Sequence, residues 1–182
     1  MKKLLALTLA LLLLVSAISI ATASSPDGVK LGLGHSIAIN RSTSATADKA
    51  GAVASNIVFC AANFDANGVI LAIHFDLAET SVPFDATGAI TADLTQAQPT
   101  VRDLGDKFGM KAASPIGLEM YQQLNGLEKW AVGKNVNDVL KMQVTSDGKT
   151  ADTDLISTTT ISIGGFLTAL QSAYADATST TR

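Results

Sequence analysis

The chain has 182 residues, a formal net charge of −3 and a single cysteine, Cys60. An acidic, weakly charged surface argues against nucleic acid and anionic membranes as partners. One cysteine excludes an intramolecular disulfide and, on ligand count, a zinc cluster or an iron–sulfur site within one chain. Because Cys60 lies in the apolar run NIVFCAANF, we predict a buried thiol rather than a reactive one.

The N-terminus has the three parts of a secretory signal peptide. Lys2 and Lys3 precede an apolar run over residues 4–20, and residues 21–23, ATA, form a small-residue cleavage pattern. We expect cleavage after Ala23 and export of residues 24–182, a single domain, to the cell surface or the medium. The apolar run is nearly long enough to span a bilayer, so an uncleaved N-terminal anchor is the alternative. Cleavage removes Lys2 and Lys3 and leaves 11 basic residues against 16 acidic ones.

The first part of the mature chain predicts strands. Residues 29–40 indicate a strand or a strand pair interrupted by Gly32 and Gly34, where a sharp turn before His35 is expected. The following residues are small and polar, which suits a loop or an edge strand. Residues 51–64 are apolar on both faces, and this pattern is typical of a strand that is covered on both sides.

A local repeat follows these strands. Residues 64–70, FDANGVI, recur as residues 84–90, FDATGAI. Asp followed three places later by Gly marks a hairpin loop, because the Asp side chain bonds the backbone and Gly takes the left-handed conformation. The repeat therefore predicts two successive hairpin turns in an antiparallel meander.

Apolar residues alternate between these two turns, as in a strand with one buried face. The predicted core row consists of Val69, Leu71, Ile73, Phe75 and Leu77. His74 and Asp76 fall on the other, less buried face. An oriented imidazole for general-base catalysis in a secreted hydrolase is one interpretation of them. A polar pair on a strand is the favoured one, because no nucleophile elbow is present and Cys60 has no evident partner.

Helical patterns follow the strands. Thr100 is a predicted cap for a short helix that ends near Gly109, and the pair Ser114 and Pro115 predicts the start of a longer helix that ends at Gly133. Its apolar stripe comprises Ile116, Met120, Leu124, Leu127 and Ala131. Trp130 lies beside this stripe, where a core or rim position is favoured over stacking on an aromatic ligand. A further short helix is expected to start at Asn135 or Asn137. Strands first and helices later predict an α+β fold, an antiparallel sheet meander with helices packed on one face and a C-terminal helix.

Residues 154–173, DLISTTTISIGGFLTALQSA, join a hydroxyl-rich run to that last helix. Its apolar face comprises Ile163, Phe166, Leu167, Leu170 and Tyr174, at helical spacing. Ser162 is the expected N-cap. Hydroxyls just before a helix N-terminus favour a phosphate, because unpaired N–H groups and the helix dipole both attract an anion. The alternative is a Thr-rich strand or loop before a capped helix, without a ligand.

This hydroxyl-rich run resembles the motif of the FMN-binding domain family of the flavinylated-threonine type, as in subunits of Na⁺-translocating NADH:quinone reductase and Rnf complexes. Asp154 matches the acidic position of the motif, and Ser157 matches its first hydroxyl. Thr160 matches the threonine that carries FMN through a phosphoester bond in flavinylated members. Thr158 and Thr159 stand where the family has Gly and Ala. The whole chain also resembles small exported proteins of anaerobic Gram-positive bacteria, in residues 109–111, 114–117 and 128–130.

The resemblance implies an exported FMN-binding-like domain that carries electrons outside the cytoplasm. FMN would be bound covalently at Thr160 or non-covalently, with Ser157, Asp154 and Ser162 as further cofactor-binding residues. The partners would be redox proteins or membrane electron carriers, and an FMN transferase if the protein is flavinylated. No catalytic or metal-binding residue is assigned, which favours an electron carrier or a binding domain over a catalyst. The alternative, motivated by Thr158 and Thr159, is a cofactor-free exported binding or cell-surface interaction module that keeps the fold.

Overall fold

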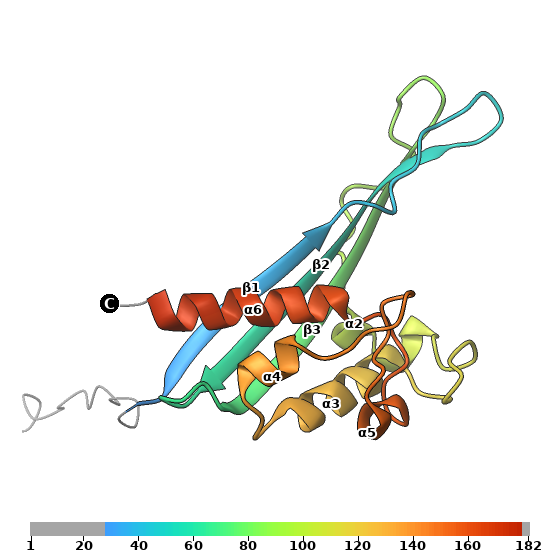
Figure 1. The fold of residues 1–182 in the computed structure, drawn as a ribbon. Helices are drawn as coiled ribbons and strands as arrows, with labels where there is room; N and C mark the ends of the chain where they lie inside the picture. The colour runs from blue at the N-terminus through green and yellow to red at the C-terminus, as the bar shows by residue number, and fades with distance from the viewer. Residues whose placement is uncertain (1–27, 180–182) are drawn as a thin grey trace, which may run out of the picture.

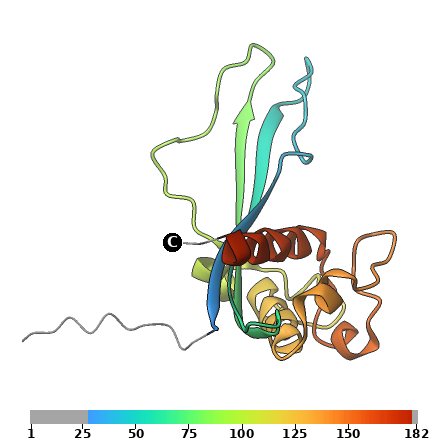
Figure 2. The ribbon, with the colours of Figure 1, turned by 60° about the vertical axis from the view of Figure 1, so that its left-hand side comes forward.

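The sheet is built from the β-rich first part of the chain, as its pattern predicts. In a computed structural model that describes residues 28–179, strands β1 (Lys30–Ala38), β2 (Gly51–Phe64) and β3 (Ile70–Phe84) pair antiparallel in the order β1-β2-β3. Figures 1 and 2 show that the far ends of β2 and β3 project beyond the helices. The predicted signal peptide, with its cleavage after Ala23, lies outside the described residues.

The helices follow the sheet in the chain and include the predicted C-terminal helix (Figure 1). They are α2 (Val101–Leu104), the 3₁₀ helix η1 (Gly105–Phe108), α3 (Met120–Ala131), α4 (Val136–Leu140), α5 (Thr153–Ile156) and α6 (Gly164–Ser179). The α+β fold class is therefore confirmed. The core lies between the sheet and the helices, where Phe64 meets Tyr174 and Phe75 meets Phe166 edge to face, with ring centroids 5.0 and 5.4 Å apart.

The first copy of the FDAxGxI repeat makes the predicted hairpin between β2 and β3. Asp65 Oδ1 accepts hydrogen bonds from the N–H groups of Asn67 at 2.8 Å and Val69 at 2.7 Å. Gly68 has a φ of 79°, a left-handed conformation that glycine adopts without strain. The chemistry of the turn thus lies in the repeat itself.

The second copy makes the same turn, but no strand follows it. Asp85 Oδ1 accepts from the N–H groups of Thr87 and Ala89, and the chain then forms only the isolated bridge between Phe84 and Ile90. After Ile90 the sequence TADLTQAQPT lacks alternating apolar residues, so a further strand would have no face to bury. The prediction of a second hairpin in the meander is therefore correct for the turn and wrong for the strand after it.

A bulge at the start of β3 changes which side chains face the core. Asn63 pairs with Ala72 while Phe64 pairs with Ile70, so Leu71 is the extra residue. Ile70 is fully buried and Leu71 is 45% exposed, the reverse of the prediction. An inserted residue shifts the two-residue period by one, which moves side chains to the opposite face. Beyond the bulge, Phe75 and Leu77 face the core as predicted.

Gly32 and Gly34 lie in the middle of β1 and contact α6, so the predicted sharp turn is wrong. A Cβ atom on Gly32 would lie 1.8 Å from the carbonyl oxygen of Ala173, and one on Gly34 would lie 2.2 Å from that of Ala169. Both alanines are fully buried. Small residues on both elements therefore let the helix backbone pack directly against the strand. Figure 1 shows α6 crossing in front of β1.

The start of α3 differs from its prediction at Ser114 and Pro115. The helix begins at Met120, and Glu119 forms a capping box with Gln122. Ser114 instead opens a turn in which its carbonyl oxygen accepts from the Gly117 N–H at 3.0 Å. Glu119 is buried, with 3% of the residue exposed, and its carboxylate also accepts from backbone N–H groups of the preceding loop. A buried cap thus sets the start of the helix, and Gly133 follows its end as predicted.

Cys60 is buried, and the pKa of its thiol is raised to about 12, first by burial and second by the nearby Glu128 carboxylate. The thiolate is the reactive form, so we expect no labelling of the native protein by a water-soluble maleimide at neutral pH and complete labelling in denaturant. Intact-mass measurement checks this. Val53→Cys, on a side chain that is 55% exposed, is the control and should add one label in the native state. Native labelling of the unmutated chain would contradict the burial.

Candidate functional site

A groove of about 640 Å³ lies between the inner sheet face and the segments that precede α3 and α6. Its apolar side chains are Ala38, Val58, Leu77, Phe108, Met110, Met120, Ile161 and Phe166. Thr160, Ser162 and Gly165 line it at the start of α6, and the wall also contains the cations Arg41 and Lys149 and the carboxylate of Glu79. The groove therefore combines apolar walls with hydroxyls, two cations, one carboxylate and a helix N-terminus.

The structure brings two of the four predicted site residues to this groove. Thr160 and Ser162 line it, whereas Asp154 and Ser157 do not. Asp154 lies exposed in the first turn of α5, and its N–H donates to the Asp152 carboxylate at 2.9 Å. Ser157 is the exposed C-cap of the same helix. The spacing in the sequence placed these residues together, but the short helix α5 turns two of them away from the groove.

Ser162 is not the N-cap of the last helix. Helix α6 begins at Gly164 and is preceded by Ile163, which is fully buried. Ser162 pairs with Lys149 in an isolated antiparallel bridge, and the Ile163 N–H donates to the Gly148 carbonyl at 2.9 Å. Pairing with the turn before α5 thus holds Ser162 extended, so the helix starts later than the capping pattern predicts.

Gln123 on α3 connects the hydroxyl-rich run to the rest of the fold. It is fully buried, and its Oε1 accepts from the Thr160 N–H at 2.8 Å and the Thr160 hydroxyl at 3.2 Å. Its Nε2 donates to Ser114 Oγ at 3.1 Å and to the Leu118 carbonyl at 3.2 Å. Every polar atom of this buried amide side chain therefore has a partner, as buried polar groups require.

Sequence reasoning missed Gln123, although a signal for it exists. Gln123 follows Met120 by three residues and precedes Leu127 by four, so it lies on the apolar stripe of the helix. A polar residue on a buried stripe needs a specific partner. That partner, Thr160, is 37 residues further along the chain, and the helical period does not identify it.

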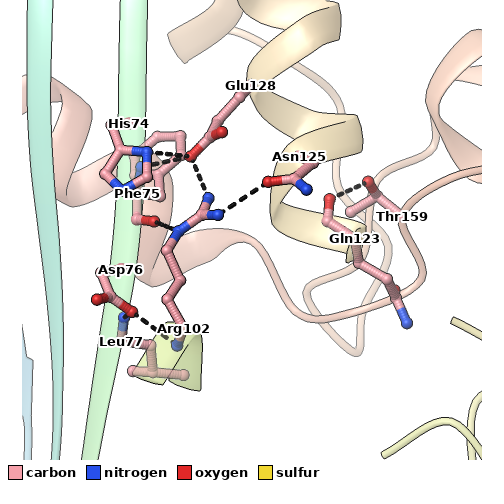
Figure 3. Close-up of polar contacts among 9 residues, drawn as sticks. All are labelled: His74, Phe75, Asp76, Leu77, Arg102, Gln123, Asn125, Glu128 and Thr159. Carbon is pink, nitrogen blue, oxygen red and sulfur yellow. Dashed lines mark hydrogen bonds and ion pairs between the residues drawn. The ribbon is translucent and has the colours of Figure 1, made fainter. Parts of the chain in front are cut away.

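The two threonines that replace the family's Gly and Ala have structural contacts of their own. Thr159 is fully buried, and its hydroxyl donates to the Gln123 backbone carbonyl at 3.0 Å (Figure 3). The Thr158 side chain lies against Gly126 so closely that a Cβ there would be 2.8 Å from Thr158 Cβ. Both threonines therefore anchor the run to α3.

A pair of opposite charges closes the outer edge of β3 (Figure 3). The Phe75 N–H donates to Glu128 Oε1 at 2.6 Å, and Arg102 Nε donates to the Phe75 carbonyl at 2.6 Å. Arg102 Nη2 lies 2.5 Å from the same Glu128 oxygen. The two side chains thus take the place of a neighbouring strand at Phe75, which protects an edge that would otherwise pair with another chain.

His74 and Asp76 lie on the less buried face as predicted, but each has another partner. His74 Nδ1 is 3.6 Å from Glu128 Oε1, while Asp76 Oδ1 accepts from the N–H groups of Leu77 and Arg102. Figure 3 shows the imidazole directed toward Glu128 rather than toward Asp76. The structure therefore does not form the His74–Asp76 pair on which the hydrolase interpretation depends.

Trp130 lies half-buried beside the α3 stripe, at the predicted rim position. Lys134 Nζ is 4.5 Å from the centroid of its ring, a cation–π contact. The indole also lines a cavity of about 360 Å³ together with Asp138, Met142 and Asp152. The indole Nε1 is buried and has no hydrogen-bond partner among the described residues.

Among residues 28–179, no group of three or more His, Cys, Asp or Glu side chains is arranged to hold a metal ion. Within the same range no helix is both long and apolar enough to span a membrane.

Comparisons with protein-family models, with curated proteins and with solved structures found no match.

Proposed function

We propose that the groove beside α6 binds FMN and that the protein is an exported electron carrier. The observation that supports the proposal is the position of Thr160, the residue that matches the flavin-bearing threonine of the family, in the wall of a groove of about 640 Å³. Ligand sites are concave and mostly apolar, with volumes of roughly 300 to 1,000 Å³ and a few polar groups that fix the orientation of the ligand.

The residues of the groove fit the two chemical parts of FMN. A flat isoalloxazine ring needs apolar walls, and Val58, Leu77 and Phe166 provide them. A phosphate needs donors and positive charge, and the start of the 16-residue helix α6, with Lys149 and Arg41, provides both. Each cation already has a surface carboxylate partner, Lys149 with Asp147 and Arg41 with Glu79. Such exposed pairs contribute little stability, so an incoming phosphate can compete for the cations.

The contacts of Thr160 are compatible with either mode of binding. Its hydroxyl donates to Gln123 Oε1 at 3.2 Å, and its N–H donates to the same oxygen at 2.8 Å. Esterification of the hydroxyl would remove the first bond and leave the second in place to hold the backbone. When bound, the flavin supplies the redox chemistry, while the protein positions it and excludes water.

The intact mass and visible spectrum of the protein test this proposal. The chain is produced in an exporting host that also has an FMN transferase. We expect a yellow protein that carries one FMN, and we expect Thr160→Ala to lose the covalent mass because the acceptor oxygen is gone. Thr168→Ala is the control, since Thr168 is an exposed threonine on α6 outside the groove lining and should keep the flavin.

Two further outcomes decide between covalent and non-covalent binding. A colourless protein of unmodified mass would contradict covalent attachment. A failure of free FMN to bind in a fluorescence titration would then contradict the non-covalent version as well. The same mass spectrum reads the N-terminus, and Met1 retained on the exported protein would contradict cleavage after Ala23.

The second candidate function is a cofactor-free exported binding module. The observation that favours it is the structural use of Thr158 and Thr159, which anchor the run to α3 without a ligand. The absence of both covalent mass and FMN binding would favour this function over the first.

A further inference from the structure

The sheet has a second face, opposite α6, that is apolar and exposed. Side chains of β1 alternate, with Gly32 and Gly34 toward α6 and the residues between them pointing the other way. The exposed fractions are 61% for Leu31, 63% for Leu33 and 62% for Ile37. Phe59 on the central strand is 46% exposed. We refer to the outward residues of β1, β2 and β3 as the outer face.

The outer face carries almost no charge. The strand register aligns its side chains in rows, which are Leu33–Ala61–His74, His35–Phe59–Asp76 and Ile37–Ile57–Ala78. Asp76 is the one carboxylate in these rows, and its oxygen already accepts two backbone N–H groups. Contiguous apolar area of this kind on an exposed face marks an interaction surface.

The outer face has both projections and a hollow. A depression of about 570 Å³ is lined by Leu33, His35, Ile37, Ile57, Phe59 and Ala61. The small Ala61 lies in the central strand next to the larger Phe59, and it pairs with Leu33 across β1. A surface with projections beside a hollow can fit a rotated copy of itself, as a two-fold interface requires.

We propose that the outer face is a homodimer interface, in which two sheets pack face to face around a two-fold axis. Stacked sheets lie roughly 10 Å apart with their side chains interdigitated. Three strands about 4.8 Å apart and about nine residues long cover on the order of 500 Å². Two copies would then bury about 1,000 Å², the lower limit for a specific interface.

Charge favours a second copy over a membrane as the occupant. The mature chain has 16 acidic residues against 11 basic ones, and the rows of the outer face contain no Lys or Arg. An anionic bilayer would therefore be repelled rather than attracted. Apart from Asp76, whose Oδ1 accepts two backbone N–H groups, the rows bring no like charges together, so the electrostatic cost of self-association is small.

The edges of the sheet also direct association to its face. At β3, Arg102 and Glu128 occupy the N–H and carbonyl of Phe75. At β1, the Leu33 N–H donates to Asp176 of α6 at 3.0 Å. Side chains thus occupy both edges at these points, and a strand of another copy cannot pair there without displacing them.

The proposed dimer leaves the groove beside α6 accessible. Groove residues Val58 and Leu77 alternate with outer-face residues Phe59 and Asp76 along the same strands. The two surfaces lie on opposite faces of the sheet, so the dimer does not depend on whether FMN binds.

Analytical ultracentrifugation of the protein purified from an exporting host tests the interface. We expect twice the monomer mass at micromolar concentration. Leu33→Lys should raise the dimer dissociation constant at least about 100-fold, because it buries an unpaired ammonium group. Leu94→Lys is the matched control. Leu94 is 65% exposed, like Leu33, but lies in the loop after β3, so this variant should dimerise normally.

Three results would overturn the proposal. One is a monomer mass for the unmutated protein at every concentration up to hundreds of micromolar. Another is a dimer that Leu33→Lys and Ile37→Lys, each with a native circular dichroism spectrum, leave intact. The third is a monomer that floats with neutral phosphatidylcholine vesicles, which would assign the outer face to lipid. The first and third results are measured on the unmutated protein, so they test the proposal even if the lysine variants fold poorly.

Discussion

Gly34→Ala is expected to lower the free energy of unfolding by about 3 kcal/mol, the upper part of the range for overpacked cores. A Cβ atom at this position would lie 2.2 Å from both the Ala169 carbonyl oxygen and the Ala173 N atom. These are backbone atoms in the middle of a helix, and they cannot move aside as the end of a side chain can. Helix α6 would have to shift as a body away from β1. Urea unfolding followed by circular dichroism measures the change.

The control for this substitution is Gly164→Ala, at the first position of α6. Beyond the adjacent residues and the helix's own backbone, no heavy atom lies within 4 Å of a Cβ built on Gly164, and alanine favours helix over glycine by about 1 kcal/mol in a helix interior. We therefore expect this variant to be as stable as the unmutated protein or slightly more stable. Equal midpoints for the two variants would contradict the direct contact of strand and helix.

Gln123→Leu is expected to lower the free energy of unfolding by about 3 kcal/mol. The substitution keeps the volume but leaves the Thr160 N–H and the Leu118 carbonyl without their partners, and an unsatisfied buried group costs about 1 to 3 kcal/mol. Because Gln123 holds Thr160 in the wall of the groove, the FMN binding that we propose should weaken as well. Urea unfolding and FMN titration give the two readouts.

Lys129→Leu is the matched control on the same helix. Lys129 is exposed, and a surface substitution of this kind changes stability by less than about 0.5 kcal/mol. If Gln123→Leu behaves like Lys129→Leu in urea, the amide of Gln123 does not hold the hydroxyl-rich run. If stability falls while FMN binding is unchanged, Gln123 supports the fold but not the groove.

Features that depend on neighbours in sequence could be predicted. The hairpin at Asp65 is built from hydrogen bonds within five residues. The cap at Thr100 is similarly local, since its hydroxyl accepts from the Asp103 N–H three residues later. Both contacts join residues that are neighbours in the sequence, so the local pattern is enough to predict them.

Features that depend on distant partners could not be predicted in this way. The register shift at Leu71 is a property of the β2–β3 pair, and alternation along one strand does not contain it. Gly32 and Gly34 looked like a turn because glycine usually serves turns, whereas here they provide space for α6. Helix α3 starts at Met120 and not at the predicted Ser114, because Glu119 caps it and has buried partners in the preceding loop.

The candidate site was predicted in part. The spacing that singled out Thr160 and Ser162 placed two residues in the groove lining, but Asp154 and Ser157 lie outside it. Most of the apolar wall comes from β2, β3, η1, α3 and α6, outside residues 154–162. The groove is therefore formed by several elements of the fold, and the motif identifies only the part of its lining near Thr160 and Ser162.

The contact between β1 and α6 has a consequence for how the chain folds. Leu33 bonds Asp176, which is 143 residues away, so the first strand packs against the last helix. β1 is synthesised before α6, and closing the loop of about 143 residues between their contact points is entropically slow. Until the C-terminal residues emerge, the glycine side of β1 has no cover and its edge is open to wrong pairing. Truncation of α6 should therefore destabilise the sheet as well as remove the helix, because the face of β1 that packs against α6 would stay exposed.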